Sequence, residues 1–264
     1  MNLALYCDFE NIALGVRDAK YAKFDIKHVL ERLLVKGSIV VKKAYCDWGR
    51  YKDFKETMHE AAFELIDIPH VRQSGKNSAD IRMVVDALDL CYTKSHVDTF
   101  VIISGDSDFS PLVSKLRENA KTVIGIGVKN STSDLLMSNC DEFIFYDDLV
   151  REDEANKRAR EAHKTKKKAS KGKSKAKPDD PLQLAIDLVI ETAEALHNER
   201  GDQEILWGSM IKQALKRRRP GFNESYYGVR SFNKLLEEAQ NRGFLDLELD
   251  ERSGGYIIRR ITVE

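Results

Sequence analysis

The sequence predicts a doubly wound α/β domain followed by a small α+β domain of the winged-helix type. In residues 1–150, short apolar runs rich in β-branched residues alternate with longer amphipathic stretches. This alternation is typical of βαβ units, in which a parallel sheet lies between two layers of helices. In residues 179–264, three stretches with helical spacing precede two strand-like stretches that are separated by a glycine-containing turn. The lysine-rich residues 151–178 lie between the two patterns and are expected to be a linker.

Length and composition fit a soluble, cytoplasmic protein. The chain has 264 residues, enough for one large domain or two smaller ones, and 33% of them are charged and 42% apolar. The apolar run from Leu3 to Cys7 is too short for a signal peptide, and no stretch approaches the length of a membrane span. The four cysteines are far apart and form no CxxC pair, which argues against disulfides and zinc: Cys7, Cys46, Cys91 and Cys140.

The first domain is expected to contain six strands and the helices that connect them. The strands correspond to residues 2–7, 38–46, 64–71, 98–104, 122–128 and 142–146. The helices correspond to residues 26–34, 50–64, 81–92, 110–119 and 132–138. Asp25 is suited to cap the first of these helices, and residues 73–78 are expected to form a loop. Because crossovers between parallel strands are right-handed, only a few doubly wound arrangements fit this order.

The strand at residues 98–104 runs into a turn of small residues that holds two carboxylates, Asp106 and Asp108. An apolar helical pattern follows, for which Ser110 or Asp108 is a suitable N-cap and Pro111 a suitable first-turn residue. In open α/β sheets, ligands bind at the carboxyl ends of the strands. Two interpretations therefore stand. Either the carboxylates belong to a site, or Asp108 caps a helix and Asp106 shapes the turn.

Carboxylates from two other parts of the chain are expected at the same edge. Asp8 ends the first strand, and Asp80 lies in the first turn of the helix before the fourth strand. If the sheet reverses between strands one and four, Asp8 and Asp106 become neighbours at the topological switch point. Asp108 and Asn11 would then lie close by. Clustered carboxylates repel one another unless a cation neutralises them, and oxygen-rich clusters suit Mg²⁺ or Mn²⁺. If Asp80 had no other carboxylates near it, its position would be better explained by the favourable interaction of a negative charge with a helix N-terminus.

Three motifs of this domain resemble, in their order, those of the NYN domain, a PIN-like nuclease group of the LabA/DUF88 type. They are Asp8-Phe9-Glu10-Asn11, Ala79-Asp80-Ile81 with Asp86, and Ser104-Gly105-Asp106-Ser107-Asp108-Phe109. The resemblance covers about residues 1–148 and implies a PIN-like α/β/α fold that cleaves RNA with Mg²⁺ or Mn²⁺.

The resemblance also implies roles for individual residues. It gives metal-binding or catalytic roles to Asp8, Asp80, Asp106 and Asp108. It gives supporting catalytic roles to Asn11 and Asp86, although six residues along a helix place Asp86 on a different face from Asp80. Lys76 precedes the second motif and is a candidate phosphate contact.

A phosphatase of the HAD type would also place an aspartate after its first strand. That chemistry requires a nucleophilic Asp and a second Asp two residues later. Here the second position is Glu10, and no threonine follows. The sequence therefore disfavours this alternative.

Positive charge is concentrated between the two domains. Residues 1–150 carry 19 basic and 23 acidic residues, residues 151–178 carry 12 and 4, and residues 179–264 carry 12 and 16. The segment from Lys164 to Lys177 contains eight lysines and no acid, with too few apolar residues for a core. We interpret this segment, which includes Lys166, Lys167 and Lys168, as a basic arm for RNA phosphates rather than as a solubilising linker alone.

The last domain is expected to be a winged helix. Its helices are expected around residues 182–196, 207–215 and 229–239, and its hairpin at residues 245–249 and 256–263. The stretch from Leu206 to Leu215, with Arg219-Pro220-Gly221-Phe222, Tyr227-Gly228 and Ser231-Phe232, resembles the OST-HTH/LOTUS domain over about residues 181–262. This resemblance implies RNA binding or protein docking rather than catalysis. The candidate RNA contacts are Lys216, Arg217, Arg218, Arg219 and Tyr227. Tyr226 is a further candidate for stacking on a base, and core packing is expected of at least one of the two tyrosines.

Together these patterns predict a metal-dependent ribonuclease that hydrolyses RNA phosphodiester bonds, with a winged helix that binds single-stranded or structured RNA. The expected division is residues 1–150, 151–178 and 179–264. The alternative is a catalytically silent RNA-binding adaptor that keeps the PIN-like fold and its carboxylates. The winged helix also suits a protein partner or self-association, and no membrane partner is expected.

Overall fold

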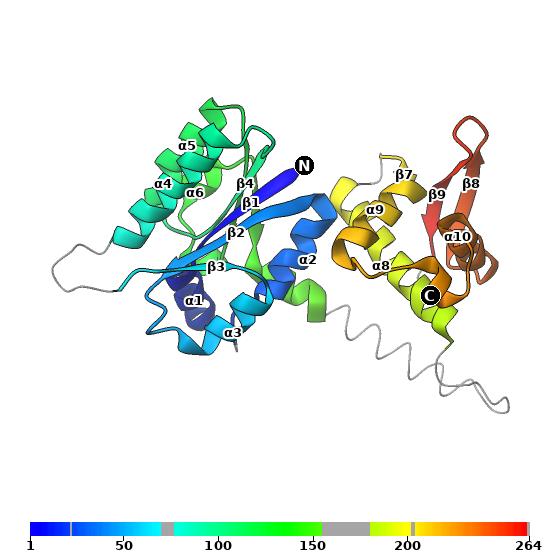
Figure 1. The fold of residues 1–264 in the computed structure, drawn as a ribbon, viewed down its shortest axis with the longest axis horizontal. Coiled ribbons are helices and arrows are strands. Elements are labelled where there is room, and N and C mark those ends of the chain that lie inside the picture. Colours follow the sequence, from blue (N-terminus) through cyan, green and yellow to red (C-terminus); the bar gives the residue numbers. More distant parts are fainter. Residues whose placement is uncertain (22, 70–76, 155–179, 202–203, 263–264) are drawn as a thin grey trace. The chain divides into compact units, whose positions relative to one another are not determined.

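The computed structural model describes residues 1–21, 23–69, 77–154, 180–201 and 204–262. The chain divides into two compact units, the first formed mainly by residues 1–154 and the second mainly by residues 180–262 (Figure 1). Each unit has a sheet and a hydrophobic core of its own. Among the described helices, none is long and apolar enough to cross a membrane.

The first unit contains a six-stranded parallel sheet. Its strands are β1 (Asn2–Asp8), β2 (Ser38–Cys46), β3 (Glu64–Asp67), β4 (Thr99–Ile103), β5 (Thr122–Gly127) and β6 (Glu142–Phe145). Their order in the sheet is β3-β2-β1-β4-β5-β6. β1 therefore pairs with β2 on one side and with β4 on the other. The expected reversal between the first and fourth strands is confirmed, and it creates a switch point at their carboxyl ends.

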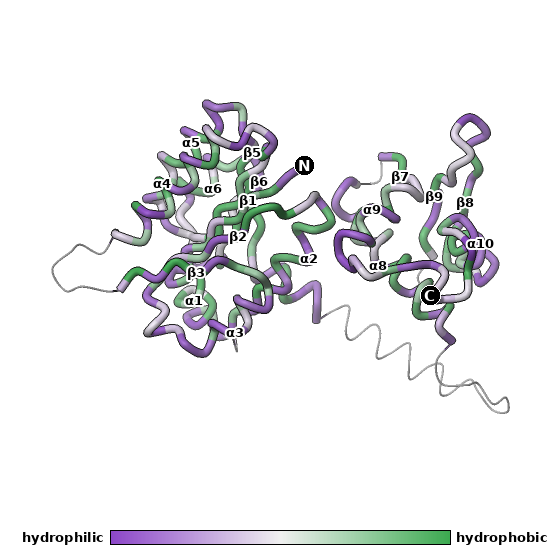
Figure 2. Tube along the Cα trace, viewed as in Figure 1, coloured by the Kyte–Doolittle hydropathy of each residue, from purple (hydrophilic) through white to green (hydrophobic). Residues whose placement is uncertain are grey.

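Helices cover both faces of this sheet, as the predicted fold class requires. They are α1 (Phe9–Asp18), α2 (Ile26–Lys36), α3 (Lys52–Glu60), α4 (Ser78–Thr93), α5 (Ser110–Glu118) and α6 (Asp134–Asn139). Alternate residues of β1 are buried on opposite faces. Leu5 packs in a core with α1, α2 and α3, whereas Tyr6 packs in a core with α4, α5 and α6. Because both faces are covered, the central strands carry nearly continuous hydrophobic runs (Figure 2).

The sequence analysis missed helix α1, and it also missed the helical residues 146–154 that follow β6. The N-terminus of α1 is capped by the Asp8 side chain, which accepts a hydrogen bond from the Asn11 N–H. Phe9, Ile12 and Val16, spaced three and four residues apart, form its buried face. An aspartate cap followed by this spacing is the signal of a helix that begins directly at the end of a strand.

Several other boundaries differ from the prediction by a few residues. α3 covers Lys52–Glu60, within the predicted residues 50–64. β3 ends at Asp67, short of the predicted Val71, and residues 70–76 lie outside the described part of the chain. α4 begins at Ser78 rather than Ile81, and Asp80 remains in its first turn.

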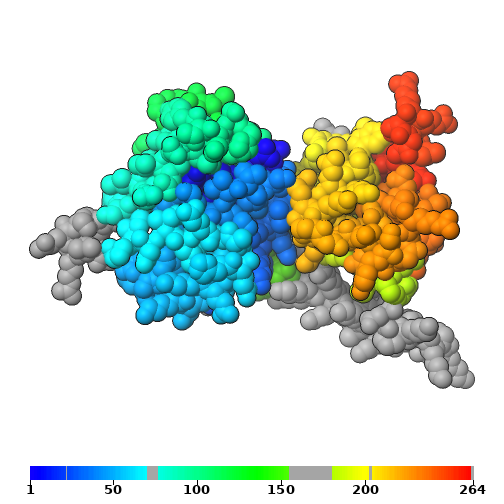
Figure 3. All heavy atoms as spheres, in the orientation of Figure 1, coloured from blue at the N-terminus to red at the C-terminus, as the bar shows by residue number. Residues whose placement is uncertain are grey.

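The second unit combines helices with a small antiparallel sheet, as predicted. Its elements are α8 (Pro181–Arg200), β7 (Leu206–Trp207), α9 (Gly208–Arg218), η3 (Glu224–Tyr227), α10 (Phe232–Asn241), β8 (Leu245–Asp250) and β9 (Gly255–Ile261). The order in the sheet is β7-β9-β8, so the short β7 adds a strand to the expected hairpin. Ile186, Ile211 and Leu236 bring α8, α9 and α10 into one core. The exposed tip of the β8–β9 hairpin projects from this unit, as the red spheres of Figure 3 show.

Candidate active site

Three carboxylates approach the switch point of the parallel sheet from separate elements. Asp8 is the last residue of β1, Asp106 follows β4, and Asp80 lies in the first turn of α4. Cys7 of β1 pairs in register with Ile103 of β4, so the ends of these two strands are adjacent. The topology therefore brings side chains from distant parts of the sequence to one edge of the sheet.

Hydrogen bonds hold Asp8 against the turn that follows β4. Asp8 as a whole is only 8% exposed. It accepts from Ser104 Oγ at 3.0 Å and from the Asn11 backbone N–H at 3.3 Å. Ser104 Oγ in turn accepts from the Asp106 N–H at 3.1 Å. The side-chain oxygen of Asn11 accepts from the Gly105 N–H at 2.9 Å. Asn11 and Ser104 therefore fix the two strand ends relative to each other.

Gly105 allows two loops to approach each other closely. A Cβ atom at this position would overlap the backbone oxygen of Ser131, in η2 (Lys129–Ser131). The Gly105 carbonyl also accepts a hydrogen bond from the Ser133 N–H at 2.9 Å. The turn that carries Asp106 is thus held against the loop after β5, and a side chain at residue 105 would have no room.

The Asp106 side chain shapes the turn in which it lies. It caps η1 (Ser107–Phe109) by accepting from the Asp108 N–H at 3.0 Å. The predicted caps of α5 are wrong. Phe109 takes the N-cap position of α5 and makes no side-chain hydrogen bond there, so neither Asp108 nor Ser110 caps this helix. The carboxylate of Asp108, the most exposed of the group, is not used to start α5.

The pKa of Asp8 is raised to about 7. Burial is the main cause, because it disfavours the charged carboxylate. The negative charges of Asp80 and Asp106 raise this pKa further, and the hydrogen bonds that Asp8 accepts offset these effects only in part.

Asp80 is affected in the same direction. Burial raises its pKa to about 6, and the charges of Asp106, Asp108 and Glu10 add to the effect. All four candidate metal-binding aspartates therefore lie within electrostatic range of Asp80 or Asp8. Among the described residues, no cationic side chain is a cause of either raised pKa.

The cluster suits a divalent cation by its charge and by its donor type. Mg²⁺ and Mn²⁺ prefer carboxylate oxygens, and a cation would relieve the repulsion that raises these pKa values. Among the described residues, no three His, Cys, Asp or Glu side chains lie close enough to share one ion. The residues that could hold a cation are therefore proposed from charge and position: Asp8, Asp80, Asp106 and Asp108.

Asp86 lies in a separate cluster of charged and polar groups. Its carboxylate pairs with Lys43 at 3.2 Å and with Arg82 at 3.0 Å. It also accepts from the Tyr45 hydroxyl at 2.8 Å. Burial alone would raise its pKa, but these hydrogen bonds and charges outweigh burial and lower it. Asp86 does not contribute to the raised pKa of Asp8 or Asp80, so the structure does not bring it into the carboxylate cluster.

Arg50 lies near this edge and was missed by the sequence analysis. Its guanidinium pairs with Glu10 at 3.1 Å and is 53% exposed. Glu10 is in the first turn of α1, and its charge raises the pKa of Asp80. Arg50 follows β2 in a tight turn, where its N–H and that of Gly49 donate to Asp47. A basic residue in the turn after a parallel strand is the signal that points to it, because all strands of this sheet end at the same edge.

The predicted basic contacts of the second unit differ in exposure. Lys216 and Arg219 are exposed, and Arg217 is half-buried. Arg218 pairs with Glu191 at 2.8 Å and is largely buried. Four further candidates lie outside the described residues: Lys76, Lys166, Lys167 and Lys168.

The two tyrosines of η3 also differ. Tyr227 stacks on Phe222 with 5.4 Å between ring centres and is half-buried. Tyr226 is 81% exposed. Of the two candidate tyrosines, Tyr227 packs within the unit, as was expected of at least one of them, and Tyr226 is the one with an exposed ring.

Comparison with known families covers the first unit. A sequence model of the NYN domain matches residues 2–147. The chain belongs to the NYN domain family. The NYN domain has a PIN-like nuclease fold, and its matched range agrees with the resemblance expected for residues 1–148.

Relatives of the NYN domain occur in distant organisms. A Methanocaldococcus jannaschii protein described as uncharacterized is 28% identical over 125 residues, which are 47% of this chain and 49% of that protein. The meiosis regulator and mRNA stability factor 1 of Xenopus tropicalis is 24% identical over 150 residues, which are 57% of this chain and 9% of that protein. The chain therefore matches half or less of the length of these relatives.

A solved structure supports the fold. The crystal structure of a Vibrio parahaemolyticus protein of unknown function matches with a TM-score of 0.50 and 26% sequence identity. The match covers 56% of this chain and 94% of that protein. The similarity agrees with an NYN domain that forms the first unit.

Gly105→Ala should destabilise the NYN domain, because the added methyl group overlaps a backbone atom that cannot turn away. We expect a loss of about 1–3 kcal/mol in the free energy of unfolding, the usual cost of overpacking. Gly49→Ala is the matched control, since its Cβ would meet only the movable carboxylate of Asp47 at 3.0 Å. Urea unfolding of both variants measures the difference. Equal stability of the two would show that the turn after β4 has room for a side chain.

Asp8→Asn should stabilise the protein above neutral pH in the absence of divalent cations. The folded-state pKa of Asp8 is raised, so folding favours its protonated form. The part of the free energy of unfolding that this form contributes is lost as pH rises from about 4 towards 7. The neutral amide of Asp8→Asn should therefore raise the free energy of unfolding by up to about 4 kcal/mol above pH 7 and by little below pH 4. Asp86→Asn is the opposite control. Its pKa is lowered, so this variant should be less stable than wild type at neutral pH.

The same variants report on cation binding. Mg²⁺ or Mn²⁺ should raise the thermal midpoint of the wild type and of Asp86→Asn, and it should raise that of Asp8→Asn much less. Calorimetric melting with added cation or with EDTA measures the shift. Equal shifts in all three proteins would remove Asp8 from the cation site.

Proposed function

We propose that this protein is a ribonuclease that depends on a divalent metal and hydrolyses RNA phosphodiester bonds at the β1–β4 edge of its NYN domain. The observation that carries the proposal is the convergence of Asp8, Asp80 and Asp106 at the switch point, where burial and mutual repulsion raise the pKa values of Asp8 and Asp80. Repulsion between these carboxylates lowers the stability of the fold, so a purely structural role does not account for their convergence.

Asp8, Asp80, Asp106 and Asp108 would hold Mg²⁺ or Mn²⁺ in this proposal. A divalent cation supplies a Lewis acid for the phosphate oxygens and lowers the pKa of water. The chain's own contribution is placement. Asn11 and Ser104 keep the ends of β1 and β4 together through the hydrogen bonds that they make. They are positioning residues.

Arg50 would contact an RNA phosphate beside the cluster. Its guanidinium is half-exposed and is already oriented by Glu10. A planar guanidinium can make paired hydrogen bonds to a phosphate. The carboxylate cluster repels a polyanion, so a fixed cation at its rim would help RNA to approach.

The second unit would hold RNA for the NYN domain. Its three helices and hairpin agree with the LOTUS-like winged helix expected from the sequence, and Lys216, Arg219 and Tyr226 offer exposed contacts. The name of the Xenopus tropicalis relative refers to mRNA stability, which is consistent with RNA as the substrate. We extend the proposal to the lysine-rich residues 151–178 as a further phosphate-binding segment, on composition alone.

The second candidate function is RNA binding without cleavage. The observation that favours it is the lack, among the described residues, of three side chains close enough to share one ion. Incubation of the purified chain with labelled RNA and Mg²⁺, Mn²⁺ or EDTA separates the two. Cleavage that requires the cation supports the nuclease, and intact RNA in a stable complex supports the adaptor.

Asp106→Asn should reduce kcat by at least about 100-fold, the scale on which a single electrostatic group acts in an active site. The amide keeps the oxygen that caps η1 but loses the charge that would hold the cation. Single-turnover cleavage with excess protein measures the rate. Asp86→Asn, outside the cluster, should keep kcat within a few-fold once its lower stability is allowed for. Wild-type turnover by Asp106→Asn would contradict the assignment.

Arg50→Gln should raise KM for RNA several-fold and change kcat little, since it removes binding that is the same in the ground state and the transition state. It should also flatten the dependence of log Kd on log salt by about 0.7, the value for one phosphate contact on a single strand. Arg17→Gln is the control, because Arg17 is exposed on α1 and pairs with the adjacent Asp18. Equal effects of the two substitutions would indicate only a general loss of positive charge.

A further inference from the structure

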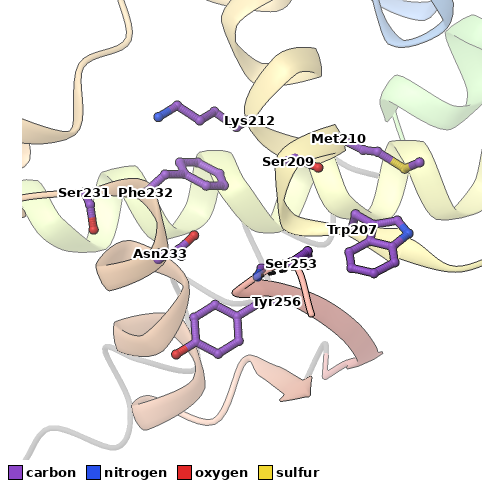
Figure 4. Close-up of a pocket in the computed structure, with 10 residues that line it drawn as sticks. Trp207, Ser209, Met210, Lys212, Ser231, Phe232, Asn233, Ser253 and Tyr256 are labelled. Atoms are coloured by element: carbon purple, nitrogen blue, oxygen red, sulfur yellow. Dashed lines mark hydrogen bonds between the residues drawn. The ribbon is translucent and has the colours of Figure 1, made fainter. Parts of the chain in front are cut away.

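A groove of about 740 Å³ opens on the second unit. Its size falls in the range of small-ligand pockets, roughly 300–1,000 Å³. The groove forms where β7 joins α9, where α10 begins and where the β8–β9 hairpin turns back. Three aromatic side chains line it: Trp207, Phe232 and Tyr256 (Figure 4). Aromatic rings from three separate elements are thus collected around one opening.

The three rings differ in how much of their surface is buried in the core. Phe232 is buried in the core of the unit. Trp207 and Tyr256 are half-buried. The Tyr256 hydroxyl donates to Glu237 at 3.0 Å, which fixes the direction of its ring. Trp207 and Tyr256 therefore keep ring surface that faces the groove and can stack on another flat π system.

Two helix N-termini meet at the same groove. α9 and α10 both begin there, and neither has an acidic residue in its first turn. The N-cap of α9 is Trp207, which makes no side-chain cap. Gly208 brings this end close to α10, since a Cβ there would lie 2.7 Å from Leu236 Cδ1. The positive ends of the two helix dipoles therefore favour a negatively charged group in this region.

Polar side chains complete the wall of the groove. The ammonium of Lys212 lies 5.7 Å from the centre of the Phe232 ring and pairs with Glu224 at 2.9 Å. Figure 4 shows Lys212 beside Phe232, and Ser253 near Tyr256. Among the described residues that line the groove, none is acidic.

Flat aromatic surface next to phosphate-attracting groups is the combination with which proteins hold unpaired nucleotides. We propose that this groove binds single-stranded RNA, with bases stacked on both Trp207 and Tyr256 and a phosphate near the start of α9. The inference rests on the proposed function, in which the second unit captures RNA. An acidic peptide would meet the same charges, but it would leave the ring surfaces without a planar partner.

Tryptophan fluorescence tests the stacking directly, because the chain contains two tryptophans. Trp48 is buried in the core of the first unit, so Trp48→Phe leaves Trp207 as the reporter. The full chain with Trp48→Phe and Asp106→Asn is titrated with a short oligouridine. We expect the emission of Trp207 to be quenched with the same midpoint as the binding isotherm. Unchanged emission at saturating RNA would overturn the proposal.

Affinity measurements test the contribution of each ring in the Asp106→Asn background. Trp207→Leu and Tyr256→Leu should each weaken oligouridine binding by about 5- to 100-fold, because stacking on an aromatic ring contributes about 1–3 kcal/mol per base. Tyr256→Phe keeps the ring and should keep the affinity. Tyr92→Leu, which removes an exposed aromatic ring from α4, is the matched control and should bind like the parent.

Three outcomes would contradict the inference. One is equal affinity of Trp207→Leu, Tyr256→Leu and Tyr92→Leu when circular dichroism shows that each is folded. Another is loss of affinity in Tyr256→Phe as large as that in Tyr256→Leu. The third is quenching and competition by polyglutamate at the same charge concentration, which would make the groove a peptide site. Because Asp106→Asn removes cleavage from these assays, their result is independent of whether the NYN domain is an active nuclease.

Discussion

The hydrogen bond between the Ser104 hydroxyl and the Asp8 carboxylate joins two strand ends that are 96 residues apart in the chain, and the candidate site depends on it. The bond exists because β1 and β4 are neighbours in the sheet. Asp8 ends a strand, caps α1 and accepts from Ser104 at the same time. A carboxylate held by two hydrogen bonds, from the Asn11 N–H and from Ser104 Oγ, has few orientations open to it. The turn at Gly105, pressed against the next loop, then sets the position of Asp106.

This arrangement has a cost in stability that the rest of the NYN domain must offset. Asp8 and Asp80 are buried or half-buried with raised pKa values, so their charged forms oppose folding at neutral pH. The residue next to Asp8 contributes in the other direction. The Phe9 ring packs against Trp48 with 4.9 Å between ring centres and against Phe54 with 5.0 Å. A well-packed aromatic cluster that includes the residue next to Asp8 thus helps to offset the unfavourable burial of its charge.

Sequence reasoning predicted the elements with a strong periodic signal and missed those defined by single contacts. The apolar runs identified the strands, and the connection rules led to the β1–β4 switch point. Helix α1 was missed because a strand runs into it without a turn, and the Asp8 cap was interpreted as a site residue alone. Ser104 was quoted in a motif, but its contact with Asp8 follows only from strand pairing. Arg50 was missed for the same reason, since its importance depends on Glu10, which lies on another element.

In the second unit, a count of basic residues overstates the positive charge that the surface presents, because some of these residues form ion pairs within the fold. The basic end of α9 was expected to contact phosphates, yet its Arg218 is paired with Glu191. Lys212, earlier in the same helix, is paired with Glu224. Charges used inside the fold contribute little to counterion release. If this unit binds RNA through ring surfaces and helix N-termini, its affinity depends less on salt than its number of basic residues suggests. Any steeper salt dependence of the whole chain would then arise outside this unit. The two contributions can be separated by comparing aromatic and basic substitutions at several salt concentrations.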